Sequence, residues 1–452
     1  MTTLWFRAAL LPEGWAEGVR LSLEGGCIAW VQAGAAPEPG DERHATGLPG
    51  LVNVHSHAFQ RAMAGLAERR GPSDDDFWSW RQQMYRLVAT LGPEAVEAVA
   101  ALAYAEMLEA GFTRVTEFHY LHHDPAGRPY ADPAEMAARI AAAAEETGIG
   151  LTLLPVFYAH AGFGGAPPAP GQRRFVNDLD GFARLVEASR RIVAGLEDAN
   201  LGVAPHSLRA ATPEEVAAVV VLADGGPVHI HAAEQVKEVA DCLAWSGQRP
   251  VAWLLDHAGV DPRWCLIHAT HIDPAEVQAL AASGAVAGLC PITEGNLGDG
   301  IFPARDFLAQ GGRFGIGTDS NVLISIADEL RLLEYGQRLT HRERNVLALE
   351  PGVATGAALY RRALAGGLQA AGRPDEGLRQ GDQASFITLA DDEALPPDPH
   401  PEGAVDRWLF ASPRTAVDCV WRRGRKLVSG GRHLRRAEIA ARCRRALAHL
   451  DG

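Results

Sequence analysis

The chain has 452 residues and a formal net charge of −14. Hydrophobic residues make up 47% and charged residues 22%, which is a globular composition, and the length suits one large α/β domain with a smaller one, or two to three domains. The negative charge argues against non-specific binding to nucleic acid or to anionic membranes. We therefore expect no nucleic-acid partner and no membrane partner.

The first residues, MTTLWFRAALLPEGW, show no basic segment followed by a long apolar run. No apolar run in the sequence reaches the roughly 18 residues that span a bilayer. The six cysteines are scattered and form no CxxC motif, which is typical of free thiols in a reducing compartment. We expect a cytoplasmic protein.

Both ends of the chain have β-like patterns. Residues 4–34 alternate between apolar and polar side chains, with Gly25 and Gly26 at an expected hairpin turn. Residues 384–390 predict a strand, and residues 416–433 predict two strands around Arg423 and Gly424. A basic helix over 435–450 follows, and its charges predict a solvated face. We expect the two ends to meet in one small β-sandwich domain.

The middle of the chain alternates short apolar runs with alanine-rich helical stretches such as 93–111 and 132–148. The second helix is predicted to begin with Asp132 as N-cap and Pro133 at its first position, and Gly148 follows its end. Eight alternating strands predict an α/β fold with a (β/α)₈ TIM-like barrel. The expected strands cover 51–57, 112–120, 151–160, 201–209, 227–234, 265–271, 285–296 and 313–321.

These patterns predict a division of the chain into three parts. Residues 1–48 form the first part of the β domain, residues 49–372 form the catalytic barrel, and residues 373–452 complete the β domain and end in a helix. Active sites of such barrels lie at the carboxyl ends of the strands.

Polar side chains gather at those ends. His55 and His57 point to one side of the first strand, because side chains alternate with a period of two. Histidine and aspartate donors without a cysteine partner suit Zn²⁺, or Fe²⁺ in the same geometry. Our predicted ligands of one divalent metal are His55, His57, His231 and Asp319. His229 shares a face with His231, so spacing alone does not choose between them.

Four motifs resemble those of the amidohydrolase superfamily: HSH after a Pro-Gly turn, HAAE, HATH and GTDS. Their order and the flanking β segments agree over the whole chain. Within the superfamily, the stretches NVHSHAFQRAMAGLAE, DDFWSWRQQMYRL, EFHYLHH and APHSLRA resemble the formimidoylglutamate deiminases of histidine degradation. The resemblance favours His231 over His229 as the ligand, and it implies a homodimer.

The number of metals follows from the position of the lysines. Many members of the superfamily bridge two metals with a carbamylated lysine on the fourth strand, but no lysine precedes Lys237 in this chain. The sequence therefore predicts a site for a single metal. Glu117 is the nearest carboxylate that could replace a lysine bridge.

The resemblance implies hydrolysis of N-formimino-L-glutamate to N-formyl-L-glutamate and ammonia. A bound metal lowers the pKa of its water to about 7, which supplies the hydroxide that attacks the amidine carbon. Glu234, His268 and Asp319 are the expected catalytic residues. The small-molecule substrate carries two carboxylates, for which arginine is the suited donor. The expected substrate contacts are Gln60, Arg81, Tyr120, His206 and Arg209.

Other roles remain open for several of these residues. Glu234 could cap the following helix, and His271 could exchange roles with His268. We predict that His122 and His123 are solvated loop residues. Arg81 could instead form a surface ion pair. Trp78 and Trp80 are predicted to pack its segment rather than to contact substrate. The Gly/Pro-rich residues 162–174 are predicted to form a loop over the barrel mouth.

Two rival functions also remain. One is another deaminase of the superfamily that acts on a purine, pyrimidine or related ring, which needs base-edge donors and a stacking aromatic more than two arginines. The other is a metal-free scaffold protein of amidohydrolase-like fold. Such a scaffold would have lost metal ligands, whereas this sequence has a complete set.

Overall fold

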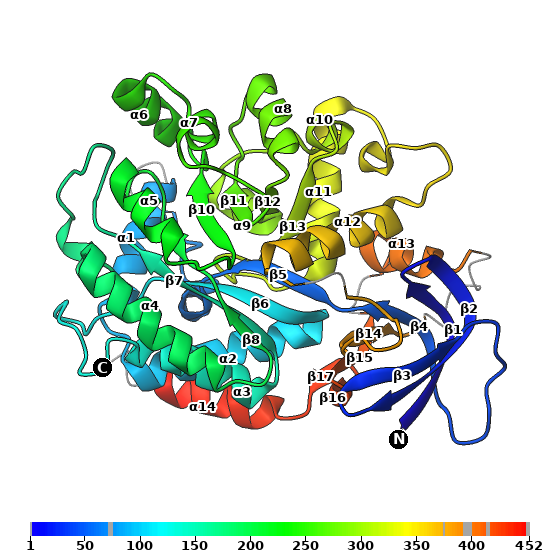
Figure 1. Ribbon diagram of the computed structural model, residues 1–452. Coiled ribbons are helices and arrows are strands. Elements are labelled where there is room, and N and C mark those ends of the chain that lie inside the picture. The colour runs from blue at the N-terminus through cyan, green and yellow to red at the C-terminus, as the bar shows by residue number, and fades with distance from the viewer. Residues whose placement is uncertain (1, 71–75, 374–375, 392–399, 413–415, 449–452) are drawn as a thin grey trace.

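The computed structural model describes residues 2–70, 76–373, 376–391, 400–412 and 416–448. Parallel strands form a barrel surrounded by helices, and a separate sheet is built from the two ends of the chain (Figure 1). The predicted α/β fold is confirmed. The barrel strands are β5 (Leu51–Ser56), β6 (Phe112–His119), β7 (Gly150–Phe157), β8 (Ala199–Leu201), β9 (Ala204–Pro205), β10 (Val228–Ala232), β11 (Trp264–His268), β12 (Val286–Leu289) and β13 (Arg313–Ile316).

Two of the eight predicted barrel strands differ from their predicted form. The fourth is interrupted: β8 and β9 both pair with β7, and a single bridge between Val203 and Val228 reaches β10. Gly202 lies in the interruption, where a Cβ atom would sit 2.3 Å from the backbone oxygen of Pro227. The seventh ends at Leu289, because Pro291 begins a helix.

The helices that follow the strands cover the outside of the barrel (Figure 1). The α-helices are α1 (Phe77–Val88), α2 (Pro93–Ala110), α3 (Glu135–Thr147), α4 (Leu179–Ala194), α5 (Pro213–Val221), α6 (Val236–Ser246), α7 (Pro250–His257), α8 (Pro274–Ser283), α9 (Pro291–Leu297), α10 (Ala304–Ala309), α11 (Ile326–His341), α12 (Thr355–Ala370), α13 (Gly403–Phe410) and α14 (Arg436–Ala448). In the described part of the chain, three short 3₁₀ helices are η1 (Ala58–Met63), η2 (Pro170–Gln172) and η3 (Val346–Ala348).

The predicted start of α3 was wrong. The helix begins at Glu135 with Ala134 as N-cap. The Asp132 carboxylate accepts a hydrogen bond from the backbone N–H of Ala134 (2.9 Å), which closes a turn before the helix rather than capping it. Gly148 ends the helix in the left-handed conformation (φ 79°), as predicted.

The second sheet joins the two ends of the chain. The amino-terminal β4 pairs in parallel with β1 and antiparallel with the carboxy-terminal β14. Phe6, Leu21, Phe386 and Trp421 are among the side chains of its separate apolar core. Its strands are β1 (Thr2–Leu11), β2 (Gly14–Glu24), β3 (Cys27–Gln32), β4 (Glu42–Pro49), β14 (Phe386–Leu389), β15 (Val417–Arg422), β16 (Arg425–Ser429) and β17 (Arg432–His433).

The last helix, α14, packs along α2, and Arg442 of α14 pairs with Glu146 of α3 (Figure 1). Ile439 and Cys443 are buried, while Arg436 bonds to Glu106 of α2 at 2.6 Å. The expectation of a simply solvated basic face was therefore wrong for Arg436, because α2 supplies it with a carboxylate. Residues 449 and 450 of the predicted helix lie outside the described residues.

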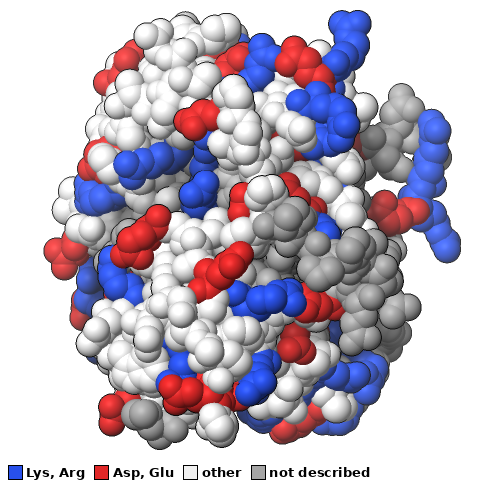
Figure 2. All heavy atoms as spheres, turned by 90° about the vertical axis from the view of Figure 1, so that its right-hand side faces the viewer, with Lys and Arg blue, Asp and Glu red and all other residues white. Residues whose placement is uncertain are grey.

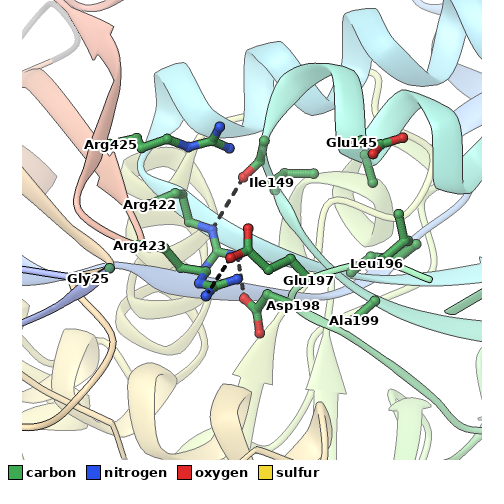
Figure 3. A pocket seen from close by; sticks show the side chains of 14 residues that line it. Gly25, Glu145, Ile149, Leu196, Glu197, Asp198, Ala199, Arg422, Arg423 and Arg425 are labelled. Atoms are coloured by element: carbon green, nitrogen blue, oxygen red, sulfur yellow. Dashed lines mark hydrogen bonds and ion pairs between the residues drawn. The ribbon is translucent and has the colours of Figure 1, made fainter. Parts of the chain in front are cut away.

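A buried ion cluster connects the terminal sheet to the amino-terminal end of the barrel. Figure 3 shows Arg422 of β15 pointing at Asp198, which precedes β8. Arg114 of β6 also binds Asp198 at 2.7 Å. These three side chains are at most 6% exposed. Because the charges are paired away from water, the cluster contributes to holding the two sheets together.

The surface carries both signs of charge. On the face shown in Figure 2, acidic and basic side chains are interspersed, and neither covers a continuous area. Within the described ranges, no helix combines the length and the apolar character that a membrane crossing requires.

Candidate metal centre and the adjoining cavity

Four donor atoms meet where β5, β10 and β13 end. Nε2 of His57 lies 3.2 Å and Nε2 of His55 lies 3.4 Å from Oδ1 of Asp319. Nε2 of His231 lies 3.1 Å from Nε2 of His55. One ligand atom from each of these residues lies within 4.8 Å of the other three, and all four residues are buried. We call these four residues the donor cluster.

The outer nitrogens of the rings fix how the imidazoles face one another. Nδ1 of His57 and Nδ1 of His231 donate to backbone carbonyls at 2.9 and 3.0 Å. Each Nε2 therefore directs a lone pair toward the cluster. Burial and the neighbouring His57 lower the pKa of His55 to about 3, so this ring is neutral as well. Converging lone pairs and a carboxylate fit a divalent metal such as Zn²⁺ or Fe²⁺.

Buried polar side chains join the ends of β5 and β13. Asn53 donates to the hydroxyl of Thr318 (2.7 Å), which donates to the side-chain oxygen of Asn321 (2.6 Å). The Asn321 amide donates in turn toward the backbone carbonyls of His57 and Asp319, both at 3.1 Å. This network fixes the backbone that carries two members of the donor cluster.

The close approach of these two strand ends requires glycine at position 317. A Cβ atom there would lie 2.8 Å from the backbone nitrogen and oxygen of His55. Backbone atoms cannot move aside as a flexible side chain can. Gly317 therefore permits the separation at which His55 and Asp319 share the cluster.

His229 lies outside the donor cluster. Its Nε2 donates to the backbone oxygen of Ala370 at the end of α12 (2.8 Å). His229 and His231 share a face of β10, as the period of two requires, but His229 precedes His231 along the strand and meets a different neighbour. The contact with α12, which is distant in sequence, thus distinguishes His229 from His231, and the spacing of the two residues could not do so.

His268, Glu234 and Glu294 form a polar group beside the cluster. Nδ1 of His268 lies 3.2 Å from Oε1 of Glu294, and its Nε2 lies 3.8 Å from both Oε1 of Glu234 and Oδ2 of Asp319. Burial opposes the charged form of His268, but these carboxylates outweigh it and raise its pKa. Burial also raises the pKa of Glu234 above its ordinary value.

A cavity opens beside these groups. It brings together every predicted catalytic and substrate-contacting residue, with three of the four members of the donor cluster. The side-chain amide of Gln60 donates to the Tyr120 hydroxyl (2.8 Å), while Oε1 of Gln60 is buried and has no hydrogen-bond partner. Predicted residues in its lining are His57, Gln60, Arg81, Tyr120, His206, Arg209, His231, Glu234, His268 and Asp319.

Two arginines that line this cavity have N–H groups without hydrogen-bond partners. Arg81 lies with its guanidinium over the Trp78 ring (4.4 Å), and its Nε is buried without a hydrogen-bond partner. A terminal nitrogen of Arg209 lies 3.8 Å from Glu234, and its Nε lies 3.9 Å from Glu238, which is too long for a hydrogen bond, so this buried Nε also has no hydrogen-bond partner. Neither arrangement satisfies the planar donor fork of arginine, so both groups are suited to a carboxylate ligand.

The predicted solvation of His122 and His123 was wrong. Both are buried, and their Nε2 atoms donate to the backbone carbonyls of Val156 and Val176 at 2.9 and 2.8 Å. Their backbone N–H groups donate to the carbonyl of Arg174, the last residue of the loop 162–174. The loop residues after β7 thus cover the histidines, and sequence alone does not show such packing.

Three other predicted alternatives can be located. Glu117 lies outside the donor cluster, and its Oε1 accepts from the backbone N–H of Ala58 (2.7 Å). His271 does not line the cavity, whereas His268 does. Trp80 lines the cavity, although we predicted that it packs its own segment.

Sequence reasoning missed several contributors to the site. Glu294 lies on α9, in residues predicted to form a strand, so its contact with His268 could not be anticipated. Tyr158 of the segment after β7 also lines the cavity, and its hydroxyl accepts from Gln172 at 2.6 Å. The predicted strand 151–160 placed Tyr158 near the barrel mouth, but a single tyrosine carries no specific signal.

Two family models match the chain. The model of the amidohydrolase family matches residues 46–427, and the model of the formimidoylglutamate deiminase HutF, N-terminal domain, matches residues 1–45. A formimidoylglutamate deiminase from Pseudomonas aeruginosa is 53% identical over 437 residues, which are 96% of each chain.

Solved structures give the same picture. An amidohydrolase from Brucella melitensis superposes over the full length of both chains with a TM-score of 0.97 and 58% identity. An adenosine deaminase from Xanthomonas campestris, solved with bound zinc, reaches 0.82 at 24% identity, over 100% of this chain and 98% of its own, and shows the shared fold alone.

Proposed function

The chain belongs to the amidohydrolase family, and from this membership we propose that it hydrolyses N-formimino-L-glutamate to N-formyl-L-glutamate and ammonia. The observation that carries the proposal is that Arg81 and Arg209, in the cavity beside the donor cluster, each have a buried Nε without a hydrogen-bond partner. The substrate has two carboxylates and one amidine, so it needs two such groups. The 53% identical relative named formimidoylglutamate deiminase supports the same substrate.

His55, His57, His231 and Asp319 would hold one divalent metal, in the arrangement of three neutral imidazoles and one carboxylate. When bound there, the metal supplies the Lewis acid that makes water a nucleophile at neutral pH. We propose zinc, with iron(II) as the alternative, because nitrogen and oxygen donors without a thiolate suit either ion.

The chain's own residues manage the protons. Water adds to the amidine carbon, and the bond from this carbon to the terminal nitrogen breaks. During attack, Asp319 accepts a proton at Oδ2 from the water and Glu234 delivers one to the terminal nitrogen. As the carbon–nitrogen bond breaks, the proton on Asp319 passes to the same nitrogen, which leaves as ammonia, and the remaining hydroxyl proton returns to Glu234. His268 is held by Glu294 at Nδ1, which turns Nε2 toward the reacting carbon, where it stabilises the developing negative charge.

The remaining polar side chains orient the substrate. Arg209 and Arg81 bind the two carboxylates, each through paired N–H groups. Gln60 offers its unpartnered carbonyl oxygen to an amidine N–H, and the hydroxyl of Tyr120 keeps the amide in place. His206, whose Nδ1 contacts Ser207 (3.0 Å), presents Nε2 as a further donor or acceptor.

The test is ammonia release by the purified, metal-loaded protein. Turnover of N-formimino-L-glutamate is expected, together with poor or absent turnover of adenosine, guanine and cytosine. No ammonia from the formimino compound, with turnover of one of the ring compounds, would replace this proposal with ring deamination. A protein that contains no transition metal after native purification would favour the scaffold function.

Further proposals concern the whole protein. We propose a homodimer, from the family resemblance, and a location in the cytoplasm, which the six free cysteines support. We also propose the domain division at residues 48 and 372. Sedimentation of the purified protein tests the first, and fractionation of cells tests the second. Calorimetry, in which independent domains give separate unfolding transitions, tests the third.

A further inference from the structure

A second group of metal-binding donors lies on the terminal sheet. One ligand atom each from His44 of β4, and from Asp418 and Cys419 of β15, lie within 4.8 Å of one another. Nδ1 of His44 is 3.9 Å from Oδ2 of Asp418, and Sγ of Cys419 is 3.4 Å from the same oxygen. This group lies on a different sheet from the donor cluster, and it includes a thiol, which the donor cluster lacks.

A β-bulge places the two neighbours on β15 together. Consecutive side chains of a regular strand point to opposite faces. In the pairing with β14, however, Thr388 faces Cys419 and Leu389 faces Val417, so Asp418 is an extra residue. Bulges of this kind redirect a side chain, and they are common beside functional sites. Here the bulge accounts for two adjacent donors in one group.

The ring of His44 is already oriented for a cation. Its Nε2 lies 3.0 Å from Oε1 of Glu42, which accepts the ring proton and leaves the lone pair on Nδ1, facing Asp418. A carboxylate behind a histidine is the usual support of a metal-ligating imidazole. The ring also packs edge-on against Trp421 at 5.1 Å, which holds its plane.

The charges of the neighbouring side chains would be neutralised by a bound divalent ion. Lys426 binds Glu42, so these two charges cancel each other. An aspartate and a cysteine thiolate would then neutralise a 2+ ion. Asp418 is 37% exposed, which leaves a path from solvent, while the His44 side chain is only 6% exposed.

We propose that His44, Asp418 and Cys419 bind a second divalent metal of thiophilic character, such as Zn²⁺ or Cd²⁺, with water completing the coordination. On binding, the S–H bond of Cys419 breaks, a sulfur–metal bond forms, and the proton is released to solvent. The ion would connect β4 with β15, two strands that β14 separates. Binding would therefore stabilise the folded terminal sheet.

Cadmium titration of the purified, zinc-loaded enzyme tests the proposal. The donor cluster contains no thiol, so an ultraviolet thiolate-to-cadmium band reports on cysteine ligation. The intact protein is expected to show this band with about one additional equivalent of Cd²⁺ and a higher melting temperature. Cys419→Ser should lose both the band and the shift, and His44→Gln should weaken cadmium binding by about tenfold or more.

Cys290 provides the control, because it is a buried thiol beside His268 and Asp319. Cys290→Ser should keep the band. A band that persists in Cys419→Ser, or the absence of any band in the intact protein, would overturn the proposal. Because Cys419 belongs to the terminal sheet and does not line the cavity, ammonia release by Cys419→Ser should equal that of the intact enzyme. Equal release shows that the variant is folded and keeps this test separate from the proposed reaction.

Discussion

The side-chain amide of Asn321 donates to the backbone carbonyl of His57 at 3.1 Å, so a residue beyond β13 determines the position of a histidine beyond β5. The same amide reaches the carbonyl of Asp319. Asn321 contacts the backbone of His57 and Asp319 and not their side chains, so it positions these two members of the donor cluster through the backbone.

We predict that Asn321→Ala weakens metal binding without removing a ligand. The substitution removes the amide hydrogen bonds to the two carbonyls, which keep their backbone donors, and it leaves the buried Thr318 hydroxyl without its acceptor. The expected cost is about 1–3 kcal/mol in the free energy of unfolding. Metal affinity should fall roughly 10–100-fold, as for other supporting residues. Metal content after dialysis against a weak chelator measures this. Asn345→Ala, at an exposed position, is the control, and equal metal retention in both variants would contradict the role of Asn321.

The paired histidines of β10 give a second prediction. His231→Asn should lose the metal and turnover, whereas His229→Asn should retain the metal. His229 loses only its hydrogen bond to Ala370, which is worth about 1 kcal/mol. Elemental analysis of the two variants, purified in parallel, distinguishes them. Loss of metal from His229→Asn with retention in His231→Asn would assign the ligand to the other histidine.

A third prediction concerns the substrate carboxylates. Arg209→Met keeps much of the side-chain volume but removes a charged donor pair, so kcat/KM for N-formimino-L-glutamate should fall at least about 10–100-fold. Metal content should stay unchanged. Arg81→Met should act similarly, and the double variant tests whether the two effects add, as expected for separate carboxylates. Unaltered kinetics in Arg209→Met would refute its contact with substrate.

The buried Asp198 predicts a pH dependence of stability. Burial alone would raise its pKa, but Arg114, Arg422 and Arg373 outweigh burial and hold the pKa of Asp198 well below its ordinary value. A lowered carboxyl pKa stabilises the fold fully above the unfolded value of about 3.9, and this contribution disappears as pH falls toward the folded value. The intact protein should therefore lose stability steeply below about pH 4.

Asp198→Asn tests that dependence. The variant should be less stable at pH 7 by roughly 3–5 kcal/mol, because three arginines lose a buried partner. Its stability should change less than that of the intact protein when the pH falls below about 4. Denaturant unfolding at several pH values measures both. Asp391→Asn, which breaks an exposed pair with Arg7, should cost at most about 1 kcal/mol, and parallel pH curves for the intact protein and Asp198→Asn would contradict the argument.

The sequence predicted the barrel because each strand has its own local signal. Apolar runs end in residues such as His57 and Asp319, and parallel strands bring such ends to one edge. The interruption near Gly202 has no comparable signal, because it depends on contact with Pro227, which belongs to a different segment. The local sequence pattern shows the periodicity of apolar residues, whereas an interruption of a strand, such as that at Gly202, arises from tertiary packing.

The same limit explains the errors at the site. His122 and His123 look like polar loop residues, and only the later segment around Arg174 reveals that they are covered. Glu294 is part of a short helix that begins at Pro291, in what resembles the continuation of a strand. The four donors were easier to predict, because metal chemistry restricts residue type and the barrel restricts place.

The junction of β4 and β5 has a consequence for synthesis. Only Gly50 separates the strand that pairs with β14 from the strand that leads to His55 and His57. As the polypeptide leaves the ribosome, β4 and β5 can pair early with β1 and β6, but their second partners, β14 and β13, lie far later in the chain, from Phe386 and Arg313 onward. Folding of either sheet must await nearly the whole chain, so contacts of high sequence separation should make this a slow-folding protein that benefits from chaperones.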